Sequence, residues 1–122
     1  MVQHRSMLNV ADNSGARKVQ VIQLLGGSGK RFGRLGETLV AVVKGALSNS
    51  QVKNGEIVRA VLVRARKEKR RDDGSYVKFD DNAAVVVDKD GNLRATRIFG
   101  PIAREVRDAG HNKIASLAQE VW

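Results

Sequence analysis

The sequence predicts a mainly β protein, a small β-barrel followed by a short helical region. About five or six short apolar runs, rich in β-branched residues, alternate with turn signals between residues 7 and 99. After Gly100-Pro101 the apolar residues are instead spaced three and four apart, which is the period of an amphipathic helix. A closed barrel would also remove the exposed edges that apolar strands otherwise present.

The expected strands follow one another along the chain. They are residues 7–10, 19–25, 38–43, 57–63, 76–79 and 83–87, with a last extended piece at 93–99. The cluster 12–15 predicts a tight turn, in which Gly15 is free to take a positive φ. The segment 26–34 predicts a flexible basic loop, and 48–55 predicts a polar connection.

A basic hairpin interrupts this pattern. The apolar run 60–63 continues into residues 64–71, of which six of the eight are Lys or Arg. Asp73-Gly74 and the returning strand 76–79 predict the hairpin, because both turn residues tolerate a positive φ. Mutual repulsion in such a basic run needs an anionic partner to offset it.

Two short helices are expected after the strands. Pro101 opens the first, where its missing N–H costs nothing, and Gly110 ends it. Ile102 and Val106 share one face of this helix. The second is indicated by the spacing of Ile114, Leu117, Ala118 and Val121. Each helix is too short to be stable alone, so both should pack against the strands.

Composition narrows the function. The 122 residues suffice for one compact domain. Their net charge of +9 predicts a polyanionic partner, and nucleic acid is favoured over an anionic membrane surface. We expect no membrane span, since no apolar run reaches about 18 residues. The N-terminus has no apolar core of a signal peptide, which argues against secretion. With no Cys, and with His4 and His111 as the only histidines, we expect neither a metal site nor a cofactor.

The candidate site is a set of cations expected to contact RNA phosphates. They are Arg17, Lys18, Lys30, Arg31, Arg34, Arg64, Arg66, Lys67, Lys69, Arg70 and Arg71. Segment 24–31 is not a nucleotide-binding P-loop, because Leu24 and Arg31 replace the required Gly and Ser or Thr. Five aromatic residues are too few for a row of stacking platforms, so structured RNA fits better than a single strand.

Two other functions stay open on the residues alone. The chain could be a free RNA-binding module, such as a translation or RNA-chaperone factor. It could also be a small enzyme that uses Asp80 or Asp81 as a general acid or base, although it offers no nucleophile in support. The paired acids 72–73 and 80–81 lie at turns, where Asp typically hydrogen-bonds its own backbone.

One motif gives the sequence a family resemblance. It comprises Ala60, the aliphatic run 61–63, nine further residues, Asp73-Gly74, Phe79, Asn82 and Val85-Val86. This pattern resembles the signature of the bacterial-type large-subunit ribosomal protein L fourteen family. Segments 8–17, 96–101 and 116–118 resemble the family too, so the similarity covers essentially the full length.

The resemblance implies a fold and a role. The fold is a single domain with a five-stranded barrel (about 1–99), a protruding basic hairpin and a helical C-terminal region (about 100–122). The role is a structural, non-enzymatic constituent of the large ribosomal subunit that binds large-subunit ribosomal RNA. It also contributes to the subunit interface and to intersubunit bridges with small-subunit RNA.

The resemblance also implies partners and a location. The partners are the neighbouring large-subunit protein, L nineteen in bacteria, and a ribosome silencing factor, whose docking positions match Thr96, Arg97 and Lys113. The ribosome would lie in the bacterial cytoplasm or in an organelle, either mitochondrial or plastid. Gln119 and Trp122 replace the usual proline and leucine of the family, which keeps the organellar option open.

Overall fold

The computed structural model describes residues 2–25, 30–47 and 52–122. The elements in chain order are β1 (Met7–Val10), β2 (Lys18–Leu24), β3 (Thr38–Val43), β4 (Ile57–Arg64), β5 (Lys69–Arg70), β6 (Tyr76–Val77), β7 (Ala83–Val87), β8 (Pro101–Ile102), α1 (Arg104–Asp108), α2 (Asn112–Leu117) and β9 (Glu120–Val121). Two of the expected loops lie partly outside the described residues, at 26–29 and 48–51.

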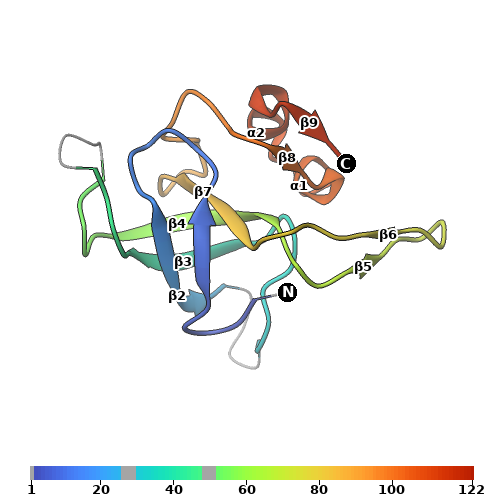
Figure 1. The fold of residues 1–122 in the computed structure, drawn as a ribbon, viewed down its shortest axis with the longest axis horizontal. Coiled ribbons are helices and arrows are strands. Elements are labelled where there is room, and N and C mark those ends of the chain that lie inside the picture. Colours follow the sequence, from blue (N-terminus) through green and yellow to red (C-terminus); the bar gives the residue numbers. More distant parts are fainter. Residues whose placement is uncertain (1, 26–29, 48–51) are drawn as a thin grey trace.

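Five strands form a closed barrel in the order β1, β2, β3, β4 and β7 (Figure 1). Neighbouring strands are antiparallel, except that β1 and β7 pair in parallel and close the barrel. The predicted strands 7–10, 19–25, 38–43, 57–63 and 83–87 agree with these five to within one residue at each end. The predicted mainly β barrel is therefore confirmed.

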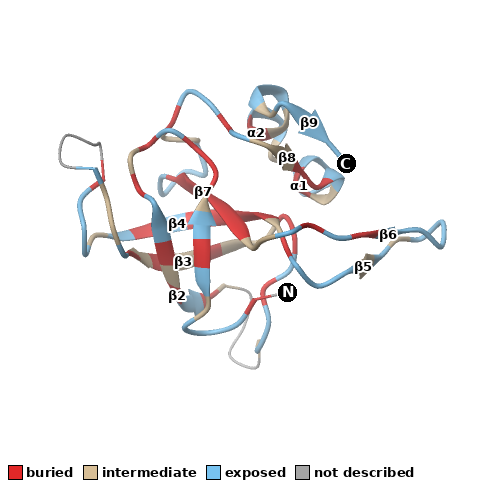
Figure 2. Cartoon of the chain, viewed as in Figure 1, coloured by how far each residue is buried: buried red, intermediate tan, exposed pale blue. Residues whose placement is uncertain are grey.

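Strand β7 is buried along its whole length, and β4 is buried on both faces over residues 60–63, as Figure 2 shows. Leu62 and Val86 belong to the cluster inside the barrel. Val61 and Val85 belong to a second cluster on its outer side, together with residues of the C-terminal region. Because water reaches neither face there, apolar residues are continuous over 60–63 and 83–87 instead of alternating with polar ones.

The C-terminal region covers that outer side of the barrel (Figure 1). Its buried side chains include Ile102, Val106 of α1 and Ile114 of α2, all in one cluster with β4 and β7. The Ala103 N–H donates to the Val63 carbonyl at 3.0 Å and ties the region to β4. Both predicted helices thus pack against strands. Neither helix of the described ranges is long and apolar enough to cross a membrane.

Two expectations for the C-terminal region are wrong. Pro101 lies in β8 instead of opening a helix, and α1 begins only at Arg104. Val121 lies in β9, because Ala118 is extended (ψ 148°) and ends α2. Strands β8 and β9 pair in parallel, and the pairing is continued by the Trp122 N–H, which donates to the Ile102 carbonyl at 2.8 Å. The helix-like spacing was thus overridden by pairing between segments distant in sequence.

The predicted extended pieces 93–99 and 76–79 also need correction. Segment 93–99 forms no strand and makes only isolated bridges, Val87 to Leu93 and Asp12 to Ile98. Its middle N–H groups donate to the side chain of Asn13 instead of to a neighbouring strand. Strand β6 ends at Val77, two residues earlier than predicted.

Candidate nucleic-acid interface

The basic hairpin protrudes from the barrel, and we call residues 65–79 the arm (Figure 1). Strands β5 and β6 pair in antiparallel register, which confirms the hairpin. At its tip, the N–H and hydroxyl of Ser75 both donate to Asp73 Oδ1, at 2.9 and 2.6 Å. The pKa of Asp73 lies below its usual value, mainly because of the Ser75 hydroxyl and then the Ser75 N–H. An ionised Asp73 therefore shapes the turn.

The root of the arm is fixed where β4 leaves the barrel. The pairing of β4 with β7 shifts register between Leu62 and Arg64, and such a bulge bends the strand. Beyond it, the Phe79 N–H donates to the Ala65 carbonyl at 3.1 Å. The Arg66 N–H donates to Asn82 Oδ1 at 2.8 Å. These bonds direct the arm away from the barrel.

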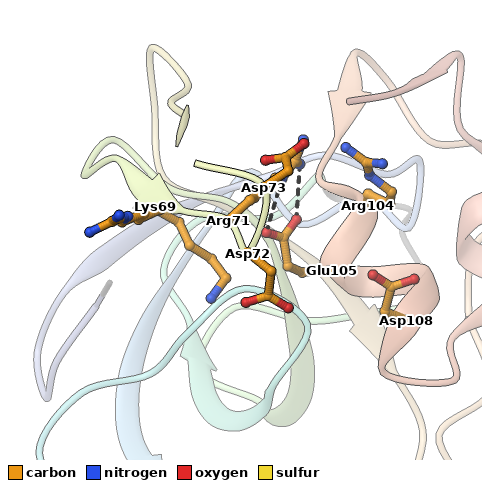
Figure 3. A pocket seen from close by; sticks show the side chains of 8 residues that line it. Lys69, Arg71, Asp72, Asp73, Arg104, Glu105 and Asp108 are labelled. Atoms are coloured by element: carbon orange, nitrogen blue, oxygen red, sulfur yellow. Dashed lines mark hydrogen bonds and ion pairs between the residues drawn. The ribbon is translucent and has the colours of Figure 1, made fainter. Parts of the chain in front are cut away.

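Arg71 joins the arm to α1. Its guanidinium binds Glu105 in a two-pronged ion pair, with Nη2 at 3.0 Å from Oε1 and Nε at 3.3 Å from Oε2. It also donates to the main-chain oxygen of Trp122. Figure 3 shows this pair at a cavity of about 410 Å³ between the arm and α1. The Arg71 and Glu105 side chains are only 15% and 16% exposed, so Arg71 serves the protein's own structure.

Glu105 is ionised in this arrangement. Burial raises the pKa of its carboxyl, but hydrogen bonds from Arg71 and from the main chain together outweigh burial and hold the pKa below its usual value. A second contact lies beside the pair, since the rings of Phe79 and Trp122 stack with centroids 5.5 Å apart. The arm is therefore attached to the C-terminal region by the Arg71 guanidinium, which binds both Glu105 and Trp122, and by one aromatic pair.

Arg64 is likewise turned inward. Its Nε lies 3.4 Å from Asp81 Oδ1, and its side chain is 14% exposed. It packs so closely on Gly100 that a Cβ there would lie 2.3 Å from Arg64 Nη1. Arg64 and Arg71 were both predicted to contact RNA, and the structure gives both of them internal partners.

The other arm cations face solvent. Arg66, Lys67 and Arg70 are exposed, and none takes part in the four ion pairs found among the described residues. Lys69 is half-buried and lines three cavities, among them the one beside α1 and a larger one of about 740 Å³. Unpaired cations on a protruding element suit contact with phosphate oxygens.

The structure brings the basic loop (residues 30–34) next to the arm. Lys30, Arg31 and Arg34 line the larger cavity with Lys69. Glu37 orders the loop, because it pairs with Lys30 and accepts the Arg34 N–H at 2.7 Å. The loop then passes close to α1 at Gly36, which has a φ of 85°, and where a Cβ would lie 2.7 Å from the Glu105 carbonyl oxygen. Glycine is required at that approach.

Other predicted site residues lie elsewhere. Arg17 and Lys18 are exposed at the start of β2, whereas the basic loop follows the far end of that strand. Thr96 and Arg97 are exposed in the segment after β7, and Lys113 is exposed on α2. These residues therefore do not join the surface formed by the arm and the basic loop.

Several organising residues were missed at the sequence level. Asp12 is buried and accepts hydrogen bonds from the Val86 N–H at 2.8 Å and from both the N–H and hydroxyl of Ser14. Asn13 Oδ1 accepts the N–H groups of Thr96 and Arg97, at 2.9 and 3.0 Å. The predicted turn at 12–15 is real, but no local pattern indicates bonds across more than 70 residues.

The chemistry that this surface offers is cationic. In the part of the chain that the structure describes, no three His, Asp or Glu side chains gather as a metal site would require.

A family model described as Ribosomal protein L14p/L23e matches residues 1–122. The chain belongs to this family. This L14p/L23e protein is therefore a ribosomal protein of the large subunit, in a family of structural proteins that do not act as enzymes.

Proposed function

We propose that this L14p/L23e protein binds large-subunit ribosomal RNA through the arm and the basic loop and so acts as a structural constituent of the subunit. The observation that carries the proposal is the convergence of the two basic segments. Lys69 from the arm and Lys30, Arg31 and Arg34 from the loop line one cavity. These four cations outnumber the three acidic residues of its lining, which are Glu37, Glu105 and Asp108. Arg66, Lys67 and Arg70 extend the same charge outward along the arm.

The electrostatic reason is counterion release. Each cation that neutralises a phosphate frees condensed counterions, so affinity should fall steeply as salt rises. Cations with internal partners contribute less to this term. We therefore assign phosphate contact to Arg66, Lys67 and Arg70 of the arm and to the exposed Arg31 and Arg34 of the loop. A supporting role falls to Arg64, Arg71 and Lys30, each of which has an acidic partner. Arg17 and Lys18 would contact RNA separately, at the other end of β2.

A second proposed surface serves the subunit interface. We infer that Thr96, Arg97 and Lys113 receive a ribosome silencing factor, and that the protein neighbours L nineteen and contributes bridges to small-subunit RNA. Support comes from Asn13, whose amide holds the exposed segment at Thr96 and Arg97 in one conformation. An ordered loop loses little entropy when a partner binds. The ribosome would be that of a bacterium or of an organelle.

Sedimentation tests the main proposal. Gradient fractions of a lysate are probed for this chain before and after a high-salt wash. A structural constituent should be stoichiometric in large subunits and in whole ribosomes and should resist moderate salt. Free protein at the top of the gradient, or loss at modest salt, would instead indicate a loosely associated RNA-binding factor.

A separate experiment tests the second surface. Arg97→Glu should abolish co-sedimentation of the silencing factor with large subunits, while Lys89→Glu, a charge reversal at another exposed cation, should preserve it. Retention of the factor by the Arg97 variant would contradict the assignment. Incorporation of both variants into subunits serves as the control.

A further inference from the structure

A smaller cavity of about 280 Å³ lies beside the basic loop. It is lined by Val2, Gln3, Ser6, Phe32 and Lys67, so the N-terminal segment, the loop and the arm all contribute to it. Four of the five lining residues were not among the predicted RNA contacts. None of the five is acidic, unlike the two larger cavities, which Glu105 and Asp108 also line.

The floor of this cavity is firmly built. Val2 and Gly33 exchange two main-chain hydrogen bonds, at 3.0 and 2.6 Å. Val2 is 3% exposed. A Cβ on Gly33 would lie 3.0 Å from Leu24 Cδ2 and 3.2 Å from Val2 Cγ2, so the two segments approach as closely as glycine allows. This contact fixes Phe32, which directly precedes Gly33, beside the N-terminal segment.

The polar wall is a turn with an uncommon backbone. Arg5 has a φ of 68°, a left-handed conformation that non-glycine residues rarely adopt and that persists when the surroundings enforce it. Its N–H donates to the Val21 carbonyl at 2.8 Å. Within the turn, the Gln3 N–H donates to the Ser6 hydroxyl oxygen at 3.0 Å. The Ser6 hydroxyl hydrogen and the side-chain amide of Gln3 take no part in this bond and can bind a ligand.

Phe32 supplies an open aromatic face. Its side chain is 47% exposed, although burial of such a ring is favourable. The same cavity is lined by Gln3, Ser6 and Lys67, whose side chains carry an amide, a hydroxyl and an ammonium group. An aromatic face for stacking, an amide for a base edge and a cation for phosphate are the three contacts by which proteins hold an unpaired nucleotide.

We infer that this cavity binds one unpaired nucleobase of RNA. The base stacks on Phe32, its edge bonds to Gln3 and Ser6, and Lys67 contacts the adjoining phosphate. The inference rests on the proposed function and adds to it a contact that reads a base instead of the backbone. Because only one aromatic ring is present, the site takes one base projecting from folded RNA and does not bind a continuous single strand.

Binding to purified large-subunit ribosomal RNA tests the stacking contact. Phe32→Ala should weaken binding by about fivefold to a hundredfold, as loss of one base–aromatic stack does. Phe32→Tyr should bind within about twofold of the wild type, since it keeps the ring. Phe99→Ala is the matched control, because Phe99 is 49% exposed and lies in another segment, and it should bind as the wild type does.

Salt dependence separates stacking from charge. Phe32→Ala should leave the slope of log affinity against log salt unchanged, because the ring is neutral. Lys67→Gln should reduce the magnitude of that slope by about one. Thermal melting of each variant checks that the protein is folded at the temperature of the binding measurement. Equal binding by Phe32→Ala and the wild type would overturn the inference.

A crosslink identifies the ligand directly. With p-benzoylphenylalanine in place of Phe32, irradiated large subunits should give a crosslink to one unpaired RNA nucleotide, mapped by primer extension. A crosslink to another protein, or to a nucleotide within a helix, would overturn the inference while leaving the proposed function intact. Absence of this chain from large subunits would instead refute the proposed function itself.

Discussion

The barrel and the arm are separate sheets joined along the chain through β4 and β7, and different forces hold them. Every barrel strand pairs with two neighbours and buries residues such as Leu62 and Val86. The arm has two-residue strands and mostly exposed charge. An isolated two-stranded hairpin is only marginally stable in water. The arm therefore depends on Arg71 and Phe79, which attach it to the C-terminal region.

The largest expected effect lies in the barrel. Leu62→Ala should lower the free energy of unfolding by about 2–5 kcal/mol, because it leaves a cavity at a fully buried position. Ile57→Ala, at a residue 66% exposed, should change it by less than about 0.5 kcal/mol. Urea unfolding measures both. Similar effects at the two positions would contradict the closed, packed barrel.

The attachment of the arm comes next. Arg71→Ala should destabilise the protein by about 1–3 kcal/mol, since it leaves the largely buried Glu105 carboxylate without its partner. Arg70→Ala removes an exposed charge next to it and should have almost no effect on stability. Chemical denaturation of this matched pair distinguishes them. Equal stability of the two variants would show that the ion pair is not structural.

Acid should weaken the same attachment. The pKa of Glu105 is lower in the folded protein than in the unfolded chain. The ionised carboxylate therefore contributes its full stabilisation of the fold at pH values above the pKa of the unfolded chain. That stabilisation is lost as the pH falls through the lower, folded value. The stability difference between the wild type and Glu105→Gln should therefore be greatest near neutral pH and shrink on acidification. Urea titrations from pH 7 to about 3 would show it, and a constant difference would contradict this origin.

The smallest effect concerns the aromatic pair. Trp122→Ala should cost about 0.5–1.5 kcal/mol beyond lost burial, because Phe79 loses its stacking partner. Trp122→Phe should retain most of that energy. Amide hydrogen exchange would follow the change. Exchange should become faster at the β5–β6 pairing, and the rate in β3 should stay the same. Uniform exchange throughout the chain would argue against a local attachment.

These contrasts also explain what the sequence could and could not predict. Strands β3 and β7 were predictable because short apolar runs bounded by turns have few other solutions. The strand conformation of Pro101 was not predictable, because it depends on pairing with Glu120, which is not a neighbour in sequence. Arg70 and Arg71 carry the same charge in adjacent positions, but successive side chains of an extended segment point to opposite sides. Only the fold decides that one meets Glu105 and the other meets solvent.

The most direct test concerns the exposed charge of the arm. The affinity of the wild type for large-subunit ribosomal RNA is measured across a salt series and compared with that of an Arg66→Gln, Lys67→Gln, Arg70→Gln variant. The account predicts a folded barrel whose log–log salt slope is less steep by about two to three units, one for each lost phosphate contact. An unchanged slope in a folded variant would contradict the assignment of RNA binding to the arm.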